Sequence, residues 1–235
     1  MPALVHEIYY SLSGEGITTG VPTIFVRIAG CSLRCGITKD GRKLWCDTGY
    51  ALSPKAGKLL SKNEIIDEIK NIMPISGAQI LITGGEPLEG ENRHLTIQLC
   101  DDYASICLNQ NHPFPRIETN GAESIRDLQN MAFTLDYKLP GSGMEERMNL
   151  DNFEVLRSRN NSQDELKFVI RDKLDFDQSV HIVHKFKPNT NILYSPVHGE
   201  VELTELAEWI KAKPVPKARL SLQMHKILWG NKKSV

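Results

Sequence analysis

Residues 23–35 read Thr-Ile-Phe-Val-Arg-Ile-Ala-Gly-Cys-Ser-Leu-Arg-Cys, an apolar run that ends in a glycine and two cysteines. Residues 23–29 predict a buried strand, because β-branched and aromatic side chains suit a pleated surface. A second such run, residues 79–83, ends in Gly84 and Gly85. In parallel α/β folds, reactive groups gather at the carboxyl ends of the strands. Both stretches therefore predict a functional site where these strands end.

Short apolar strands alternate with longer amphipathic segments along the rest of the chain. Strands are expected over residues 116–119, 132–136, 165–170, 191–194 and 218–222, helices over residues 61–73, 93–108, 121–130, 176–186 and 203–212, and a loop over residues 140–151. Ser61 and Glu64 form a capping box, which marks a helix start. Cys100 and Cys107 lie in an expected helix and are interpreted as buried packing. The alternation predicts a mostly parallel α/β sheet that right-handed crossovers curl into a full or partial β/α barrel.

The composition indicates an ordinary globular protein. The chain has 235 residues, of which 40% are hydrophobic and 24% charged, and its net charge is −1. A single domain over residues 1–235 is therefore expected. The near-zero charge favours neither a nucleic acid nor a membrane as a partner. No apolar run is long enough to span a bilayer, and the start of the chain lacks a signal-peptide pattern, so a cytoplasmic location is expected.

Three cysteines, Cys31, Cys35 and Cys46, lie close together after the first predicted strand. Thiolates are soft ligands that suit zinc or an iron–sulfur cluster. A structural zinc site needs four ligands, but no fourth cysteine is near, and the histidines nearest in sequence, His6 and His94, are remote. Three cysteines leave one iron of a 4Fe–4S cluster open for a chelating cofactor. A cluster is therefore favoured over zinc or unliganded thiols.

The cysteine loop resembles the signature of radical S-adenosylmethionine enzymes, in which the spacing is Cys-x3-Cys-x2-Cys. Here ten residues separate Cys35 and Cys46. Removing residues 37–44 would restore the usual spacing, and Asp40-Gly41 is a turn signal. Residues at about 37–44 are therefore expected to loop out as a hairpin insertion. Residues 83–87, Thr-Gly-Gly-Glu-Pro, resemble the segment of these enzymes that binds the amino group of S-adenosylmethionine.

Further motifs resemble one family of radical S-adenosylmethionine enzymes, the 7-carboxy-7-deazaguanine synthases. They occupy residues 7–16, 20–23, 25–31, 45–48, 117–121 and 223–226, and the resemblance runs from about residue 7 to 228. It implies a partial, incomplete β/α barrel with a 4Fe–4S cluster, S-adenosylmethionine and Mg²⁺. The implied reaction, in queuosine or related deazapurine biosynthesis, converts 6-carboxy-5,6,7,8-tetrahydropterin to 7-carboxy-7-deazaguanine with loss of ammonia. An electron donor such as flavodoxin or ferredoxin and a homodimer are also implied.

The resemblance also assigns residues to each ligand. The pterin substrate would contact Leu12, Ser13, Gly14, Glu15, Arg27, Thr83, Glu118, Asn120 and His225. S-Adenosylmethionine would contact Trp45, Asp47, Gly84, Gly85, Glu86, Asp136, Tyr137, Lys138, Ser195, Pro196 and Val197. Cys31, Cys35 and Cys46 would hold the cluster, and Thr48 would bind Mg²⁺. Residues 229–235 form a longer, basic tail, so the role that a terminal carboxylate has in some relatives is not carried over.

Structural alternatives stay open for several of these residues. Arg27 could form a bidentate contact with the substrate carboxylate, or it could be a buried arginine paired with Glu15 or Glu118. Asn120 could belong only to a turn, and His225, expected to approach from the last strand, could be a structural histidine. Two other functions also remain open. One is a radical activase that acts on a partner protein, and the other is a zinc-stabilised binding module without catalysis.

Overall fold

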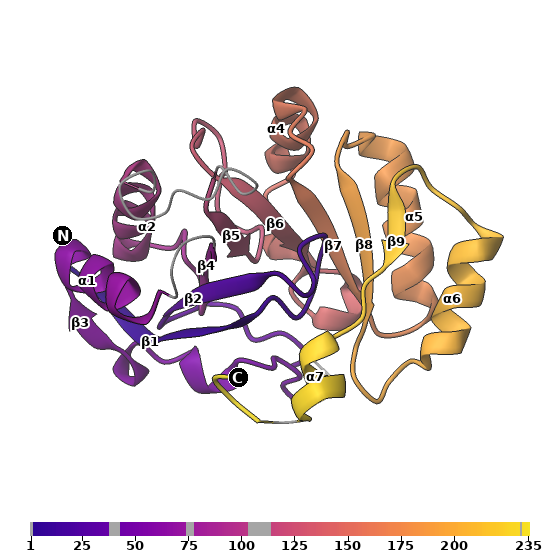
Figure 1. Ribbon diagram of the computed structural model, residues 1–235. Coiled ribbons are helices and arrows are strands. Elements are labelled where there is room, and N and C mark those ends of the chain that lie inside the picture. Colours follow the sequence, from indigo (N-terminus) through magenta and orange to yellow (C-terminus); the bar gives the residue numbers. More distant parts are fainter. Residues whose placement is uncertain (1, 38–42, 74–77, 103–113, 231) are drawn as a thin grey trace.

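The computed structural model describes residues 2–37, 43–73, 78–102, 114–230 and 232–235. Nine strands of these residues form one curved sheet in the order β3-β1-β2-β4-β5-β6-β7-β8-β9 (Figure 1). Their bounds are β1 Ala3–Leu12, β2 Pro22–Ile28, β3 Lys58–Leu60, β4 Gln79–Gly84, β5 Arg116–Thr119, β6 Ala132–Tyr137, β7 Glu165–Ile170, β8 Asn191–Pro196 and β9 Ala218–Leu220.

All neighbours from β2 to β9 pair in parallel, whereas β1 runs antiparallel to both β2 and β3. The sheet does not close, because β3 and β9 lie at its two edges in the described part of the chain. The fold is therefore an incomplete β/α barrel, as the sequence predicts. The antiparallel strands β1 and β3 are additions that the pattern of alternation does not predict.

The two faces of the sheet differ, because successive side chains of a strand point to opposite sides. In β7, Leu166, Phe168 and Ile170 are fully buried on the helix side. There Phe168 lies near Tyr194 of β8, with ring centroids 6.0 Å apart, and Tyr194 packs against Phe176 of the covering helix. The intervening residues of β7 face the inside of the curve. The apolar core thus lies between sheet and helices, and the inner face carries both polar and apolar side chains, such as Lys167 and Val169 of β7.

Helices accompany the strands along the sheet (Figure 1). Their bounds are α1 Lys62–Ile72, α2 Glu91–Asp101, α4 Asp151–Arg159, α5 Lys173–Phe186, α6 Leu203–Ala212 and α7 Met224–Trp229. The predicted capping box starts α1: Glu64 N–H donates to Ser61 Oγ, and Ser61 N–H donates to the Glu64 carboxylate at 2.8 Å. Helix α2 covers the first part of the helix predicted over residues 93–108. The remainder of that prediction, which includes Cys107, lies outside the described residues. No described helix is long and apolar enough to cross a membrane.

The helix predicted over residues 121–130 is wrong. This crossover from β5 to β6 is a series of turns that begins at Gly121, where φ is +78°. The buried side chain of Asn152 replaces helical hydrogen bonds: its Nδ2 donates to the carbonyls of Gly121 and Glu123, and its Oδ1 accepts from Ile125 N–H at 3.0 Å. A polar side chain from α4 satisfies the backbone groups that a helix would otherwise pair internally. The loop predicted over residues 140–151 holds two short 3₁₀ turns, Pro140–Ser142 and Glu145–Arg147.

Candidate active site

A cavity of about 640 Å³ lies inside the curve of the sheet. Neighbouring parallel strands from β2 to β8 each contribute a side chain to its lining, namely Arg27, Thr83, Glu118, Asp136, Lys167 and Ser195. The turn after β1, the cysteine loop, α7 and the last residues of the chain complete the lining. Almost all the residues that the sequence predicts as site residues therefore meet in one place, although they come from most of the length of the chain.

All three predicted cluster ligands line this cavity. Cys31 follows β2 and accepts a hydrogen bond from Asn120 Nδ2 at 3.6 Å. Trp45 N–H donates to the carbonyl of Cys35 at 3.1 Å. This bond joins the two ends of the segment that separates Cys35 from Cys46, so Cys46 returns beside Cys35. The hairpin predicted at about residues 37–44 stays a prediction, because residues 38–42 lie outside the described residues.

The three cysteines that line the cavity supply three thiolates, which are the ligands that iron–sulfur clusters take. Within the described residues, no three His, Cys, Asp or Glu side chains are grouped so as to hold one metal ion. Burial raises the pKa of the Cys31 thiol to about 11. Ligation must therefore displace its proton, as is usual for thiolate ligands.

Gly84 and Gly85 press against the start of the cysteine loop, backbone to backbone. Gly85 N–H donates to the carbonyl of Ile28, and Glu86 N–H donates to that of Gly30, both at 2.7 Å. A Cβ on Gly85 would lie 1.9 Å from the Gly30 oxygen, and Gly84 has a φ of +132°. Only glycine fits this approach. The predicted cofactor segment is thereby fixed next to Cys31.

The Glu86 carboxylate is occupied by the protein itself. It is 1% exposed, and it accepts hydrogen bonds from Leu88 N–H at 3.0 Å and from Thr119 Oγ1 and Asn120 N–H at 2.7 Å. Burial raises the pKa of Glu86 to about 7. These bonds tie the end of β4 to the end of β5, and the side chain does not belong to the cavity lining. The contact predicted between Glu86 and S-adenosylmethionine stays a prediction.

The segment after β6 offers an unsatisfied acceptor to the cavity. Lys138 Nζ pairs with Asp136 Oδ2 at 2.8 Å, whereas Asp136 Oδ1 is buried without a hydrogen-bond partner in the described structure. A buried carboxylate oxygen without a donor is costly, so it suits a bound ligand with hydroxyl or amine groups. The remaining predicted cofactor residues also line the cavity: Trp45, Asp47, Gly84, Gly85, Tyr137, Lys138, Ser195, Pro196 and Val197.

Thr48, the predicted magnesium ligand, lies between the cysteine loop and β4. Its hydroxyl donates to the carbonyl of Gly84 at 3.2 Å and lies 3.4 Å from Cys46 Sγ. Both Thr48 and its neighbour Asp47 line the cavity. The hydroxyl is therefore within reach of a ligand that occupies the cavity.

Glu15 is held at the cavity wall by a residue that the sequence did not single out. Lys167 Nζ donates to Glu15 Oε2, and Gln223 Nε2 donates to Glu15 Oε1 at 2.8 Å. Burial alone would raise the pKa of Glu15, but the charge and the hydrogen bond of Lys167 outweigh it and lower that pKa below its ordinary value. The sequence signal that could have identified Lys167 is the alternation of side chains along β7. This alternation places Lys167 on the same face of the sheet as Glu165 and Val169.

His225 reaches the cavity from a helix, so the expected approach from the last strand is wrong. It lies in α7, which docks on the turn after β1 through a hydrogen bond from Met224 N–H to the carbonyl of Gly14 at 2.9 Å. A Cβ on Gly14 would lie 2.2 Å from His225 Nδ1, so glycine is needed for this contact. Burial lowers the pKa of His225, which leaves the imidazole neutral at neutral pH.

Arg27 pairs with a residue on the neighbouring strand β1. Its Nε lies 2.7 Å from Glu7 Oε1, and its Nη2 donates to Tyr9 Oη at 2.9 Å. The guanidinium carbon also lies 5.7 Å from the centre of the Tyr50 ring. The alternative partners proposed for Arg27 from the sequence, Glu15 and Glu118, are therefore wrong. A preoriented guanidinium on a cavity wall is suited to bind a planar anion.

The basic tail after α7 folds back over this wall. Lys232, Lys233, Ser234 and Val235 line the cavity. Ser234 Oγ donates to Glu7 Oε2 at 2.5 Å, and Lys233 Nζ lies 4.2 Å from the centre of the Tyr50 ring. The tail therefore contacts two of the residues that also surround Arg27, a neighbourhood that its sequence alone did not indicate.

Comparisons with known proteins agree with this site. The family described as a 4Fe-4S single cluster domain matches residues 12–135. The chain is 57% identical over 232 residues to 7-carboxy-7-deazaguanine synthase of Leptospira interrogans, covering 98% of this chain and 97% of that one. It is 33% identical to the synthase of Clostridium acetobutylicum, covering 98% of each chain. The fold resembles that of QueE from Escherichia coli, with a TM-score of 0.67, 23% identity and coverage of 96% and 95%.

An incomplete β/α barrel with three cysteines after its first parallel strand defines a radical S-adenosylmethionine enzyme, whose cofactors are a 4Fe–4S cluster and S-adenosylmethionine. Within this class, the chain belongs to the 7-carboxy-7-deazaguanine synthase family, which places it in queuosine biosynthesis. The zinc-stabilised module without catalysis is thereby rejected.

Proposed function

We propose that the protein converts 6-carboxy-5,6,7,8-tetrahydropterin to 7-carboxy-7-deazaguanine with loss of ammonia. The observation that carries this proposal is that one cavity holds a preoriented arginine, Arg27, together with two partly buried carboxylates, Glu15 and Glu118. The substrate has a carboxylate that matches Arg27 and a pterin edge of N–H donors that matches a carboxylate acceptor. Leu12, Ser13, Gly14, Thr83, Asn120 and His225 are the other proposed substrate contacts.

The cysteine side of the cavity is proposed to bind the cofactors. Cys31, Cys35 and Cys46 would hold the cluster, and the other predicted cofactor residues of the cavity would bind S-adenosylmethionine. When bound, the reduced cluster and S-adenosylmethionine supply a hydrogen-abstracting radical, which is chemistry of the cofactors and not of the protein. The protein binds and orients the cofactors and the substrate, and it excludes water from the cavity. Asp136 Oδ1, which has no donor in the described structure, is proposed to accept a hydrogen bond from S-adenosylmethionine.

Glu15 and Glu118 are prepared for different tasks. Lys167 keeps Glu15 ionised, which makes Glu15 a pure acceptor for substrate N–H groups. Burial raises the pKa of Glu118, whose Oε2 accepts a hydrogen bond from Thr83 Oγ1 at 2.7 Å. A carboxyl group with a raised pKa is suited to exchange a proton. We therefore assign recognition to Glu15 and proton transfer to Glu118.

One anaerobic assay tests the proposed reaction. Reconstituted protein, reductant, S-adenosylmethionine and Mg²⁺ are mixed with 6-carboxy-5,6,7,8-tetrahydropterin, and the deazaguanine acid and ammonia are quantified. We expect both products in equal amounts and cleavage of S-adenosylmethionine that depends on the pterin. Cleavage that ignores the pterin, or a radical found on an added protein, would favour the activase alternative. A related tetrahydropterin without the carboxylate is the matched control and should not be converted.

Magnesium is proposed to bind together with the substrate. One hydroxyl, that of Thr48, is a weak site for a hard cation, and Mg²⁺ commonly completes its shell with water and substrate oxygens. Omitting Mg²⁺ and adding a chelator should lower turnover roughly tenfold, with ionic strength held constant by a monovalent salt. Iron content is measured in parallel to show that the chelator leaves the cluster intact. Unchanged turnover would contradict the assignment of Thr48.

Three further features are proposed for the whole protein. The chain is taken to be one radical S-adenosylmethionine domain over residues 1–235, which the single sheet of the described residues supports. An electron donor such as flavodoxin or ferredoxin would reduce the cluster, and a homodimer is proposed from the resemblance to the family. A cytoplasmic location stays an expectation from the sequence.

A further inference from the structure

A buried ion pair lies at the amino ends of the parallel strands, outside the cavity lining. Arg116 opens β5 and Glu165 opens β7, and Arg116 Nη1 lies 3.1 Å from Glu165 Oε2. The two residues are 2% and 1% exposed. Replacing a buried ion pair with apolar residues of similar volume is often neutral or stabilising. The pair therefore calls for an explanation other than stability.

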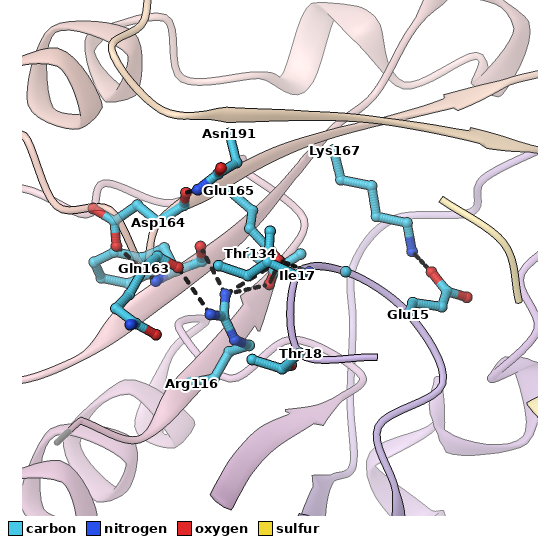
Figure 2. Close-up of polar contacts among 12 residues, drawn as sticks. Glu15, Ile17, Thr18, Arg116, Thr134, Gln163, Asp164, Glu165, Lys167 and Asn191 are labelled. Carbon is cyan, nitrogen blue, oxygen red and sulfur yellow. Dashed lines mark hydrogen bonds and ion pairs between the residues drawn. The ribbon is translucent and has the colours of Figure 1, made fainter. Parts of the chain in front are cut away.

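The turn between β1 and β2 lies directly on this pair (Figure 2). We call residues 13–21 the substrate loop. Its two ends are joined by hydrogen bonds from Ser13 N–H to Val21 O and from Gly20 N–H to Ser13 O, both at 2.8 Å. Its tip is held differently, because Ile17 N–H donates to Glu165 Oε1. At Gly16, where φ is +80°, a Cβ would lie 2.7 Å from the same oxygen. The loop thus packs its backbone against the carboxylate.

Other groups fix the orientation of that carboxylate. Thr134 Oγ1 of β6 donates to Glu165 Oε2 at 2.5 Å, and Arg116 Nη2 donates to the carbonyl of Gln163 at 2.8 Å. Arg116 Nη1 also donates to Thr134 Oγ1 at 3.1 Å. Strands β5, β6 and β7 therefore hold Glu165 in one position, and Oε1 is the oxygen that faces the loop.

We propose that the Arg116–Glu165 pair positions the substrate loop, so that Glu15 is presented to the pterin. Strand β7 would hold the loop at two points, because Glu165 and Lys167 project from the same face. Glu165 binds the backbone at Ile17, and Lys167 binds the side chain of Glu15 (Figure 2). Glu165 and Arg116 are positioning residues and not catalytic residues. The inference rests on the proposed function, in which the substrate loop binds the pterin.

The test compares Glu165→Gln with the wild-type enzyme by two readouts. Hydrogen–deuterium exchange of the substrate-free protein reports the order of residues 13–21, and steady-state kinetics separate KM for the pterin from kcat. Losing the charged acceptor should increase exchange at Ile17 roughly tenfold and raise KM roughly tenfold, with kcat changed by less than about threefold. Iron content should stay unchanged. The double variant Arg116→Met/Glu165→Gln removes both charges together, so it tests the same loss if the single variant does not fold.

A neighbouring ion pair supplies the matched control. Arg159 Nε lies 2.8 Å from Asp164 Oδ2, and Asp164 is fully buried, next to Glu165 in the sequence. In the described structure, the hydrogen bonds of Asp164 go to residues outside the substrate loop. Arg159→Met also breaks a buried ion pair, so it should lower the melting temperature. It should leave hydrogen–deuterium exchange in the substrate loop and KM for the pterin at their wild-type values.

The outcomes separate this inference from the proposed function. Faster exchange in the loop with a raised KM supports the inference. Loop exchange at the wild-type value in the Glu165 variants overturns it, and so does an Arg159→Met variant that shows the same loop and KM changes. Faster exchange with an unaltered KM also overturns it, because the loop would then not bind the pterin. If the wild-type enzyme does not convert the pterin, the proposed reaction fails, whereas the exchange data still test the contact between Glu165 and the loop.

Discussion

Cys46→Ala is expected to fold but to hold no stable 4Fe–4S cluster and to make no product. Cys46 is only partly buried, so removing its sulfur should cost less than about 1 kcal/mol of folding free energy. Its thiolate, however, is one of three ligands that must all deprotonate and bind to retain the cluster. Two remaining cysteines cannot fix a cubane with a single open corner. Turnover should fall by at least about a thousandfold, since the cofactors carry the radical chemistry.

The measurements are iron and sulfide content, absorbance of the anaerobic protein, and product formation. Cys100→Ala is the matched control, because Cys100 is a buried thiol in α2 that does not line the cavity. It should lose some stability, about 1 kcal/mol for a small buried side chain, and keep full iron content. A Cys46→Ala protein with the wild-type complement of iron would contradict the ligand assignment and with it the return of the chain to Cys35.

Arg27→Met should lower kcat/KM for the pterin by at least about a hundredfold, because it would remove the paired hydrogen bonds proposed between Arg27 and the substrate carboxylate. Methionine preserves the aliphatic volume between Tyr9 and Tyr50 but removes the fork that contacts Glu7. The effect should appear mainly in KM if the contact is equal in the ground state and the transition state. Arg27→Lys should rescue only part of the loss, because an ammonium cannot reproduce the planar fork.

Arg93→Met controls for removing a partly buried arginine elsewhere. Arg93 lies in α2, where its Nη1 donates to the carbonyl of Ser124 at 2.7 Å, and it does not line the cavity. The kcat/KM of the Arg93→Met variant for the pterin should match the wild-type value. The iron content of Arg27→Met should also be normal, so that substrate binding alone is measured. A KM for the pterin unaltered by Arg27→Met would show that Arg27 serves only to hold Glu7 and the two tyrosines.

Local patterns were sufficient for much of the fold and of the cysteine side of the cavity. The alternation of strands and helices predicted the parallel part of the sheet, and the Ser61 capping box appears where its spacing placed it. Gly84 and Gly85 were also visible as glycines that follow a strand, and the structure shows the close backbone approach that requires them. The strands, the capping box and the positions of the two glycines are encoded in short stretches of sequence, whereas the contact of Gly85 with Gly30 joins two distant stretches.

The amino-acid sequence by itself thus determined the class of the enzyme and the edge of the sheet where its site lies, and it predicted three cysteines as the cluster ligands. Only the tertiary structure decided which partners hold the substrate side: Glu7 for Arg27, Lys167 for Glu15 and Glu165 for the substrate loop. It also decided that residues 121–130 are turns held by Asn152 and that His225 comes from a helix. The physical reason is that most of these contacts join residues far apart in the chain, and even the nearest ones are set by strand pairing and side-chain packing, which no local periodicity records.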